Sequence, residues 1–85
     1  MTNPSTLRVL YFAQVAERTG VRQESWDWPQ EGTVQQWLDA LLQRHPDLQD
    51  MAGRLKVAVN QFHARPDDPV RAGDEVAVFE PVTGG

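Results

Sequence analysis

The chain has 85 residues, a formal net charge of −4 and no cysteine. This length allows a single domain with one modest hydrophobic core, so we expect no deep active-site cleft. The lack of cysteine excludes disulfides, thiolate metal sites and a cysteine nucleophile, and the scattered basic residues form no stripe that would bind nucleic-acid phosphates.

The N-terminal segment predicts a loose leader followed by a strand. Residues 1–5 are polar, include a proline and lack the charged and apolar regions of a signal peptide. From Thr6 on, Leu7, Val9 and Tyr11 alternate with a second set that is partly apolar. This pattern predicts a central strand covered on at least one face. No apolar run approaches the ~20 residues of a membrane span, so we expect a cytoplasmic protein with no membrane partner.

A connection and a second strand come next. Residues 13–20 predict a connection with a helical turn that Gly20 ends. Residues 22–28 alternate again and predict a strand that stops at Pro29. The chain's tryptophans could suggest stacking on nucleic-acid bases, but their spacing in this strand and in the following helix favours the core. They are Trp26, Trp28 and Trp37.

One amphipathic helix is predicted in the middle of the chain. Apolar residues recur there at i, i+3, i+4, i+7 and i+8, which gives a single apolar stripe. Its members are Val34, Trp37, Leu38, Leu41 and Leu42. Thr33 stands at the N-cap position, and Gln36 is placed to complete a capping box. Pro46 ends the helix at His45, because proline disfavours a helical conformation for the residue before it.

The C-terminal half predicts two further strands separated by turns. After an irregular stretch, Lys56–Asn60 predicts a strand with its valines facing inward. Residues 61–72 are rich in Pro and Asp and predict turns with at most a short strand. Gly73–Asp74 predicts a tight turn, and Glu75–Phe79 predicts the last strand.

These elements predict an α+β domain over residues 6–79, in which one main helix packs across a mixed sheet of four to five strands. Residues 80–85 continue past the last strand as a tail. Pro81 has no N–H to give a neighbouring strand and biases Glu80 toward an extended conformation. Val82 and Thr83 favour extended geometry as well. Six extended residues can project roughly 20 Å beyond the sheet.

The chain ends on two glycines, Gly84 and Gly85, and these carry the chemical prediction. Without a Cβ the tail can pass through a narrow channel and its backbone can approach a nucleotide closely. A terminal carboxyl has a pKa of ~3.5, so it is ionised at neutral pH and can attack the α-phosphorus of ATP. An incoming sulfur could then replace AMP and leave a thiocarboxylate. Glycine pairs are also common in disordered tails, so the proline-stiffened exit from a compact domain is what favours function.

Several segments together resemble a known family. They are Val9–Val15, Val59–Gln61, Gly73–Phe79 and Pro81–Gly85. The chain resembles the small, sulfur-carrying subunit of molybdopterin synthase, a ubiquitin-like β-grasp protein, over nearly all of residues 7–85. Glu80 stands where a proline or an apolar residue is expected.

The resemblance implies a function and its partners. An E1-like activating enzyme would use ATP to adenylate Gly85, a persulfide donor would make the thiocarboxylate, and the large synthase subunit would transfer the sulfur to a cyclic pterin monophosphate. On that resemblance Gly85 carries the acyl group, and Gly84, Thr83, Val82 and Pro81 thread into the partner. Phe12 and Phe79 are expected to contact partners, although phenylalanine is usually buried and core placement is an equal alternative. The chain itself would bind no cofactor and no metal, would not be an enzyme alone, and would form a heterotetramer.

Other interpretations remain open from the residues. The carrier could instead serve thiamine thiazole synthesis or tRNA thiolation, or the domain could be a ubiquitin-like interaction module with an incidental tail. A self-sufficient enzyme has almost no residue support, because no P-loop or nucleophile elbow occurs. His45 and His63 have no companion at metal-ligand spacing and are expected at a helix end and on a surface loop.

Overall fold

The computed structural model describes residues 5–28 and 31–81. Its elements in chain order are β1 (Thr6–Tyr11), α1 (Ala13–Thr19), β2 (Gln23–Asp27), β3 (Gly32–Thr33), α2 (Val34–Arg44), the 3-10 helix η1 (Pro46–Arg54), β4 (Lys56–Val59), β5 (Phe62–His63), β6 (Pro69–Val70) and β7 (Glu75–Phe79). None of the helices in these residues has the length and apolar character that crossing a bilayer demands.

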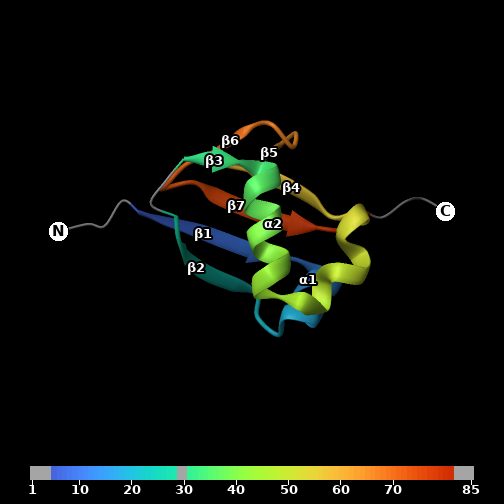
Figure 1. The fold of residues 1–85 in the computed structure, drawn as a ribbon. Helices are drawn as coiled ribbons and strands as arrows, with labels where there is room; N and C mark the ends of the chain where they lie inside the picture. Colours follow the sequence, from blue (N-terminus) through green and yellow to red (C-terminus); the bar gives the residue numbers. More distant parts are fainter. Residues whose placement is uncertain (1–4, 29–30, 82–85) are drawn as a thin grey trace.

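Five strands form one mixed sheet in the order β2-β1-β7-β4-β5. The first and last strands, β1 and β7, are parallel neighbours, and the other pairs in this sheet are antiparallel. Helix α2 crosses one face of the sheet, as Figure 1 shows. The predicted α+β architecture is confirmed, with the strand number at the upper end of the expected range.

Helix α2 follows its sequence signals closely. The Thr33 side chain accepts a hydrogen bond from the Gln36 backbone N–H, while the Gln36 side chain accepts one from the Thr33 N–H, which completes the predicted capping box. Val34, Trp37 and Leu41 are buried, and the other two members of the apolar stripe pack against the core while partly exposed. The helix ends at Arg44, immediately before His45.

The stretch after α2 is the largest difference from the sequence prediction. Residues predicted to be irregular form the helix η1, which begins at Pro46 and buries Leu48 and Met51 completely. These two residues are three apart, and in a 3-10 helix such residues lie on the same side. The region therefore supplies part of the hydrophobic core that holds α2 and α1 in place.

The predicted turn region also contains more structure than expected. Strands β5 and β6 have two residues each, and β6 pairs with β3 in a small second sheet. Val70 of β6 is fully buried, and its carbonyl accepts a hydrogen bond from Trp28 Nε1 at 3.1 Å. Trp26, Trp28 and Trp37 are all buried, so their interpretation as core residues is confirmed.

Both ends of the chain continue beyond the described residues. Residues 1–4 of the predicted leader and residues 82–85 of the predicted tail lie outside them, as does Pro29, the predicted end of the second strand. Within the described part, Gly20 ends α1 in a left-handed conformation with φ of 82°, as predicted for the end of the first connection.

Candidate functional site at the root of the C-terminal tail

The candidate site begins where the chain leaves the middle of the sheet. Strand β7 lies between β1 and β4, and its residues Val76 and Val78 are fully buried. Immediately after Phe79 the strand ends, and Pro81 is exposed. We call Phe79, Glu80 and Pro81 the tail root. The predicted threading and acyl-carrying residues, Val82, Thr83, Gly84 and Gly85, lie outside the described residues, so their roles stay predictions.

Phe12 and Phe79 lie at the same end of the sheet. Tyr11 is in register with Val78, and the Phe12 N–H donates to the Val78 carbonyl at 3.2 Å. Phe12 is 49% exposed, and Phe79 is half-buried. Neither belongs to the buried core, so both are accessible for the partner contacts predicted for them. The contacts themselves remain predictions.

An apolar strip extends from these phenylalanines along the sheet face opposite α2. Side chains of residues that are in register across neighbouring strands lie on the same face, which places Leu10 with Ala77, and Ala77 with Ala58. All three are partly buried. We define the apolar strip by its residues Leu10, Phe12, Ala58, Ala77, Phe79 and His63.

The sequence interpretation missed the place of His63 in this strip. The His63 and Phe79 rings meet edge to face, with centroids 5.4 Å apart and planes at 89°. His63 lies there because β5 pairs with β4, which puts it opposite Ala58. The prediction of a surface loop was therefore wrong in detail, since the residue is exposed but sits on a strand. Alternation in register with Lys56–Asn60 is the signal that could have found it.

A two-residue turn fixes the hairpin that carries His63. Asn60 and Gln61 both have positive φ, at 52° and 75°, as the tight turn between β4 and β5 requires. Asn60 also joins this turn to the start of β7, because its side chain donates to Asp74 Oδ1 at 3.0 Å and accepts from the Glu75 N–H at 2.9 Å. The Val59–Gln61 segment thus has a structural role in positioning one edge of the apolar strip.

One ion pair reaches the tail root. Arg54 Nε, in the last turn of η1, donates to Glu80 Oε2 at 2.5 Å. The Glu80 side chain is 26% exposed, so the pair is partly shielded from water. Of the ion pairs in residues 5–28 and 31–81, this one lies closest to the tail along the chain.

A second polar cluster lies on the α2 side of the sheet, where Tyr11 is in register with Val78, and connects the sheet to the end of α2. Glu24 Oε1 accepts hydrogen bonds from Tyr11 Oη at 2.6 Å and Trp26 Nε1 at 2.9 Å, and it lies 3.1 Å from His45 Nε2.

Burial alone would raise the pKa of Glu24, but these hydrogen bonds outweigh it and hold the pKa below its ordinary value. Burial, reinforced by the neighbouring carboxylate, raises the pKa of Tyr11 well above its ordinary range. We call Tyr11, Glu24, Trp26 and His45 the Glu24 network; His45 lies at a helix end, as predicted.

Comparison with known proteins decides the family. The model of the ThiS family matches residues 9–85. The molybdopterin synthase sulfur carrier subunit of Escherichia coli (strain K12) is 42% identical over 82 residues, covering 93% of this chain and 99% of that protein. The chain belongs to the ThiS family. The human protein of the same name is 40% identical over 82 residues, covering 93% of each chain.

Solved structures of similar proteins agree with the fold. The small archaeal modifier protein 1 of Haloferax volcanii, known from a crystal structure, superimposes with a TM-score of 0.78 at 34% identity, covering 94% of this chain and 99% of that one. This confirms the predicted ubiquitin-like β-grasp fold. The recurrence of the sulfur carrier name in bacterial and human relatives supports a sulfur carrier role in molybdenum cofactor biosynthesis, with the chain acting as a carrier subunit rather than as an enzyme alone.

Proposed function

We propose that this ThiS family member carries sulfur on Gly85 for molybdopterin synthesis. An E1-like activating enzyme binds ATP, and the Gly85 carboxylate attacks the α-phosphorus, forming an acyl-adenylate and releasing pyrophosphate. A persulfide then displaces AMP to give an acyl disulfide, and a thiol cleaves its S–S bond to leave the thiocarboxylate. Adenylation is needed because a free carboxylate resists attack at carbon. The chain contributes the acyl group and binds neither ATP nor a metal.

The position of the tail root is the observation that supports this proposal most. Strand β7 is paired on both sides and buried at Val76 and Val78, so the domain holds the start of the tail firmly. Pro81 cannot continue the ladder, because it has no N–H. A rigid domain whose last paired strand leads directly into Pro81 suits a carrier whose reactive group must enter another protein's active site, and we expect Pro81, Val82, Thr83 and Gly84 to form the threading segment.

The apolar strip beside the tail root is the proposed docking surface for the large synthase subunit. Exposed apolar area next to a reactive tail allows one partner to bind the domain and receive the tail together. A solved complex of subunits 1 and 2 of the molybdopterin-converting factor from Helicobacter pylori contains a chain of the same fold, with a TM-score of 0.63 at 21% identity. We propose that Phe12 and Phe79 contact the large subunit in a cytoplasmic heterotetramer, and that the activating enzyme uses the same end of the domain.

Mass spectrometry of the reacted chain tests the proposal. The protein is incubated with ATP, an activating enzyme of this family and a persulfide source, and intact and tandem spectra are recorded. We expect an oxygen-to-sulfur exchange located on Gly85. Localisation is essential, because oxidation of Met1 or Met51 adds nearly the same mass.

Product assays separate this pathway from its neighbours. The thiocarboxylate form is offered to a molybdopterin synthase large subunit, to a thiazole synthase and to a tRNA thiolation enzyme. Consumption by the large subunit with formation of the dithiolene supports the proposal. Consumption only by one of the other enzymes contradicts it, as does attachment of the chain to other proteins without any thiocarboxylate intermediate.

A further inference from the structure

We propose that Arg54 is a positioning residue for the C-terminal tail, because its ion pair with Glu80 restrains the direction in which the chain leaves the sheet. This inference rests on the proposed function, since it concerns how the tail is presented to the enzymes that activate and use it. It assigns a role in tail presentation to Arg54, a residue that belongs neither to the tail nor to the apolar strip.

The two partners come from distant parts of the chain and meet where β7 ends. Arg54 and Glu80 are 26 positions apart, and their side chains are 57% and 26% exposed. In Figure 1 the end of η1 lies next to the point where the chain continues beyond β7 toward the C-terminus. The contact therefore joins the tail root to an element packed on the core.

The backbone ladder cannot make this connection by itself. The pairing of β4 with β7 ends at Lys56 opposite Phe79. Two residues further on, Pro81 has no N–H with which to extend the ladder. The Arg54–Glu80 pair lies just beyond the last paired residues, so a side-chain contact takes over where backbone pairing stops.

The residues around Arg54 make it a firm anchor. Met51 is fully buried, and Leu55 is only 6% exposed, so the chain is held on both sides of Arg54. The Leu55 N–H also donates to the Ala52 carbonyl at 3.3 Å at the end of η1. Because its backbone is held in place, Arg54 can restrain Glu80. An arginine on a mobile loop would move together with Glu80 and would restrain it little.

Restraint at the root should affect binding more than chemistry. A peptide that already points toward its channel loses less conformational freedom when it enters. Ion pairs of this exposure change an equilibrium by about two- to fivefold. The expected signature is therefore a change in the KM for the carrier, with kcat unchanged.

A charge-swap experiment tests the inference in the adenylation reaction. We compare the native chain with Arg54→Gln, Glu80→Gln, the double variant, and the swapped pair Arg54→Glu with Glu80→Arg. Each single variant is expected to raise the KM about two- to fivefold. The double variant should be no worse than either single variant, and the swapped pair should recover most of the loss. Unchanged KM values, or effects of the two single variants that simply add, would overturn the inference.

A control exists in an exposed ion pair that involves neither Arg54 nor Glu80. Arg71 Nε and Glu31 Oε2 lie 3.6 Å apart, with side chains 61% and 77% exposed. Glu31→Gln breaks that pair without touching the tail root, so it should leave the KM unchanged. A rise equal to that of Glu80→Gln would show a general charge effect and overturn the assignment.

A partner-free measurement separates this inference from the proposed function. The ¹⁵N order parameter of the Glu80 backbone amide is measured in the native chain and in Arg54→Gln. A lower value in the variant supports the positioning role, and an unchanged value overturns it, whether or not the carrier is adenylated. Failure of the native chain to be adenylated counts against the proposed function alone.

Discussion

The Glu24 network and the tail root are two polar arrangements built in opposite ways. Glu24 is 17% exposed and gathers several partners on one carboxylate oxygen, which fixes the sheet to the end of α2. Within residues 5–28 and 31–81, Glu80 has one charged partner, Arg54, and its neighbour Pro81 is exposed. The comparison teaches that this small domain places its shielded polar contacts where they hold the fold, and has a more exposed ion pair at the tail root, where we propose that the chain meets its partners.

Removal of Gly85 should separate the two regions most completely, because it should affect sulfur transfer and leave the stability of the fold unchanged. We expect sulfur transfer to be abolished, because the remaining Gly84 carboxylate ends about 3.5 Å short of the position where it must react, while the free energy of unfolding changes by less than about 0.5 kcal/mol. Urea unfolding and thiocarboxylate mass spectrometry measure the two effects. A chain with one residue added after Gly85 is the matched control and should be equally inactive and equally stable. Transfer by either variant would contradict the assignment of the reactive group.

Glu24→Gln should have the reverse effect, on stability and not on transfer. Loss of the charge that His45 and Arg44 face should cost about 1–2 kcal/mol of unfolding free energy. Because the folded-state pKa of Glu24 is lowered, its contribution is fully present above the ordinary carboxyl pKa and is lost as the pH falls through the lower folded value. Urea unfolding from pH 7 downward should therefore show the native chain and the variant converging in acid. If the difference in unfolding free energy between the two chains grew as the pH fell, the expected direction of the pH dependence would be refuted.

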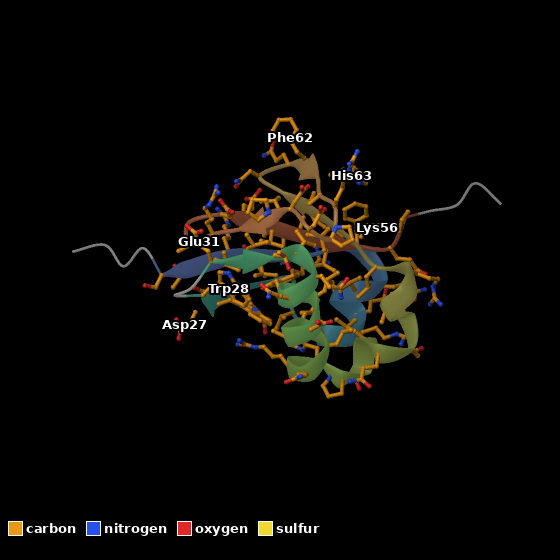
Figure 2. The ribbon with its side chains drawn as sticks, turned by 45° about the horizontal axis from the view of Figure 1, so that its top comes forward. Asp27, Trp28, Glu31, Lys56, Phe62 and His63 are labelled. Atoms are coloured by element: carbon orange, nitrogen blue, oxygen red, sulfur yellow. The ribbon has the colours of Figure 1, made fainter. Side chains whose placement is uncertain are left out.

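Phe12→Ser should weaken partner binding with little effect on folding. Phe12 is 49% exposed, and truncation of an interface phenylalanine costs on the order of 1–2 kcal/mol of binding free energy. Calorimetry with the large subunit measures the Kd. Phe62→Ser is the matched control, because Phe62 is 76% exposed and, in Figure 2, projects from the hairpin away from the side where His63 and Lys56 lie. Equal weakening by both variants would contradict the proposed docking surface.

Tyr11→Phe should give the smallest effect and sharpen the description of the Glu24 network. It removes one donor to Glu24 and leaves the ring in the core, so we expect a loss of about 1 kcal/mol in unfolding free energy. The native phenol should also resist ionisation, since its pKa is raised, and stability should fall above pH 10 as the unfolded chain ionises first. Tyr11 is the only tyrosine, so tyrosinate absorbance reports it directly. Ionisation of the folded chain at the ordinary tyrosine pKa would contradict this.

The sequence predicts those parts of the fold whose signals are local. The capping box at Thr33, the stripe on α2 and the buried valines of β7 are each set by residues a few positions apart. The helix η1 and strand β3 were missed, and residues 61–72 hold two short strands where at most one was predicted. These elements depend on packing: Leu48 becomes a core residue only when η1 lies against its neighbours. Two-residue strands carry no period that a pattern can show.

The candidate site divides in the same way. The roles of Gly84, Gly85 and Pro81 stay predictions from the sequence, and so do the partner contacts of Phe12 and Phe79, for which the structure excludes the alternative of core placement. The contacts of Glu80 with Arg54 and of His63 with Phe79 join residues 26 and 16 positions apart, which no local pattern reveals. Glu80 stands out in the sequence only as an unexpected residue before Pro81, and the structure gives it a partner.

The parallel pairing of the first and last strands has a mechanical consequence. A partner that pulls on the tail applies force along β7, and β7 is paired with β1 on one side and β4 on the other. Such a force acts in shear. All the hydrogen bonds that join β7 to its two neighbours must then break together, whereas a peeling force would break them one after another. If the tail enters an enzyme channel as we propose, this pairing would let the domain be pulled back out without unfolding after each round of loading and transfer.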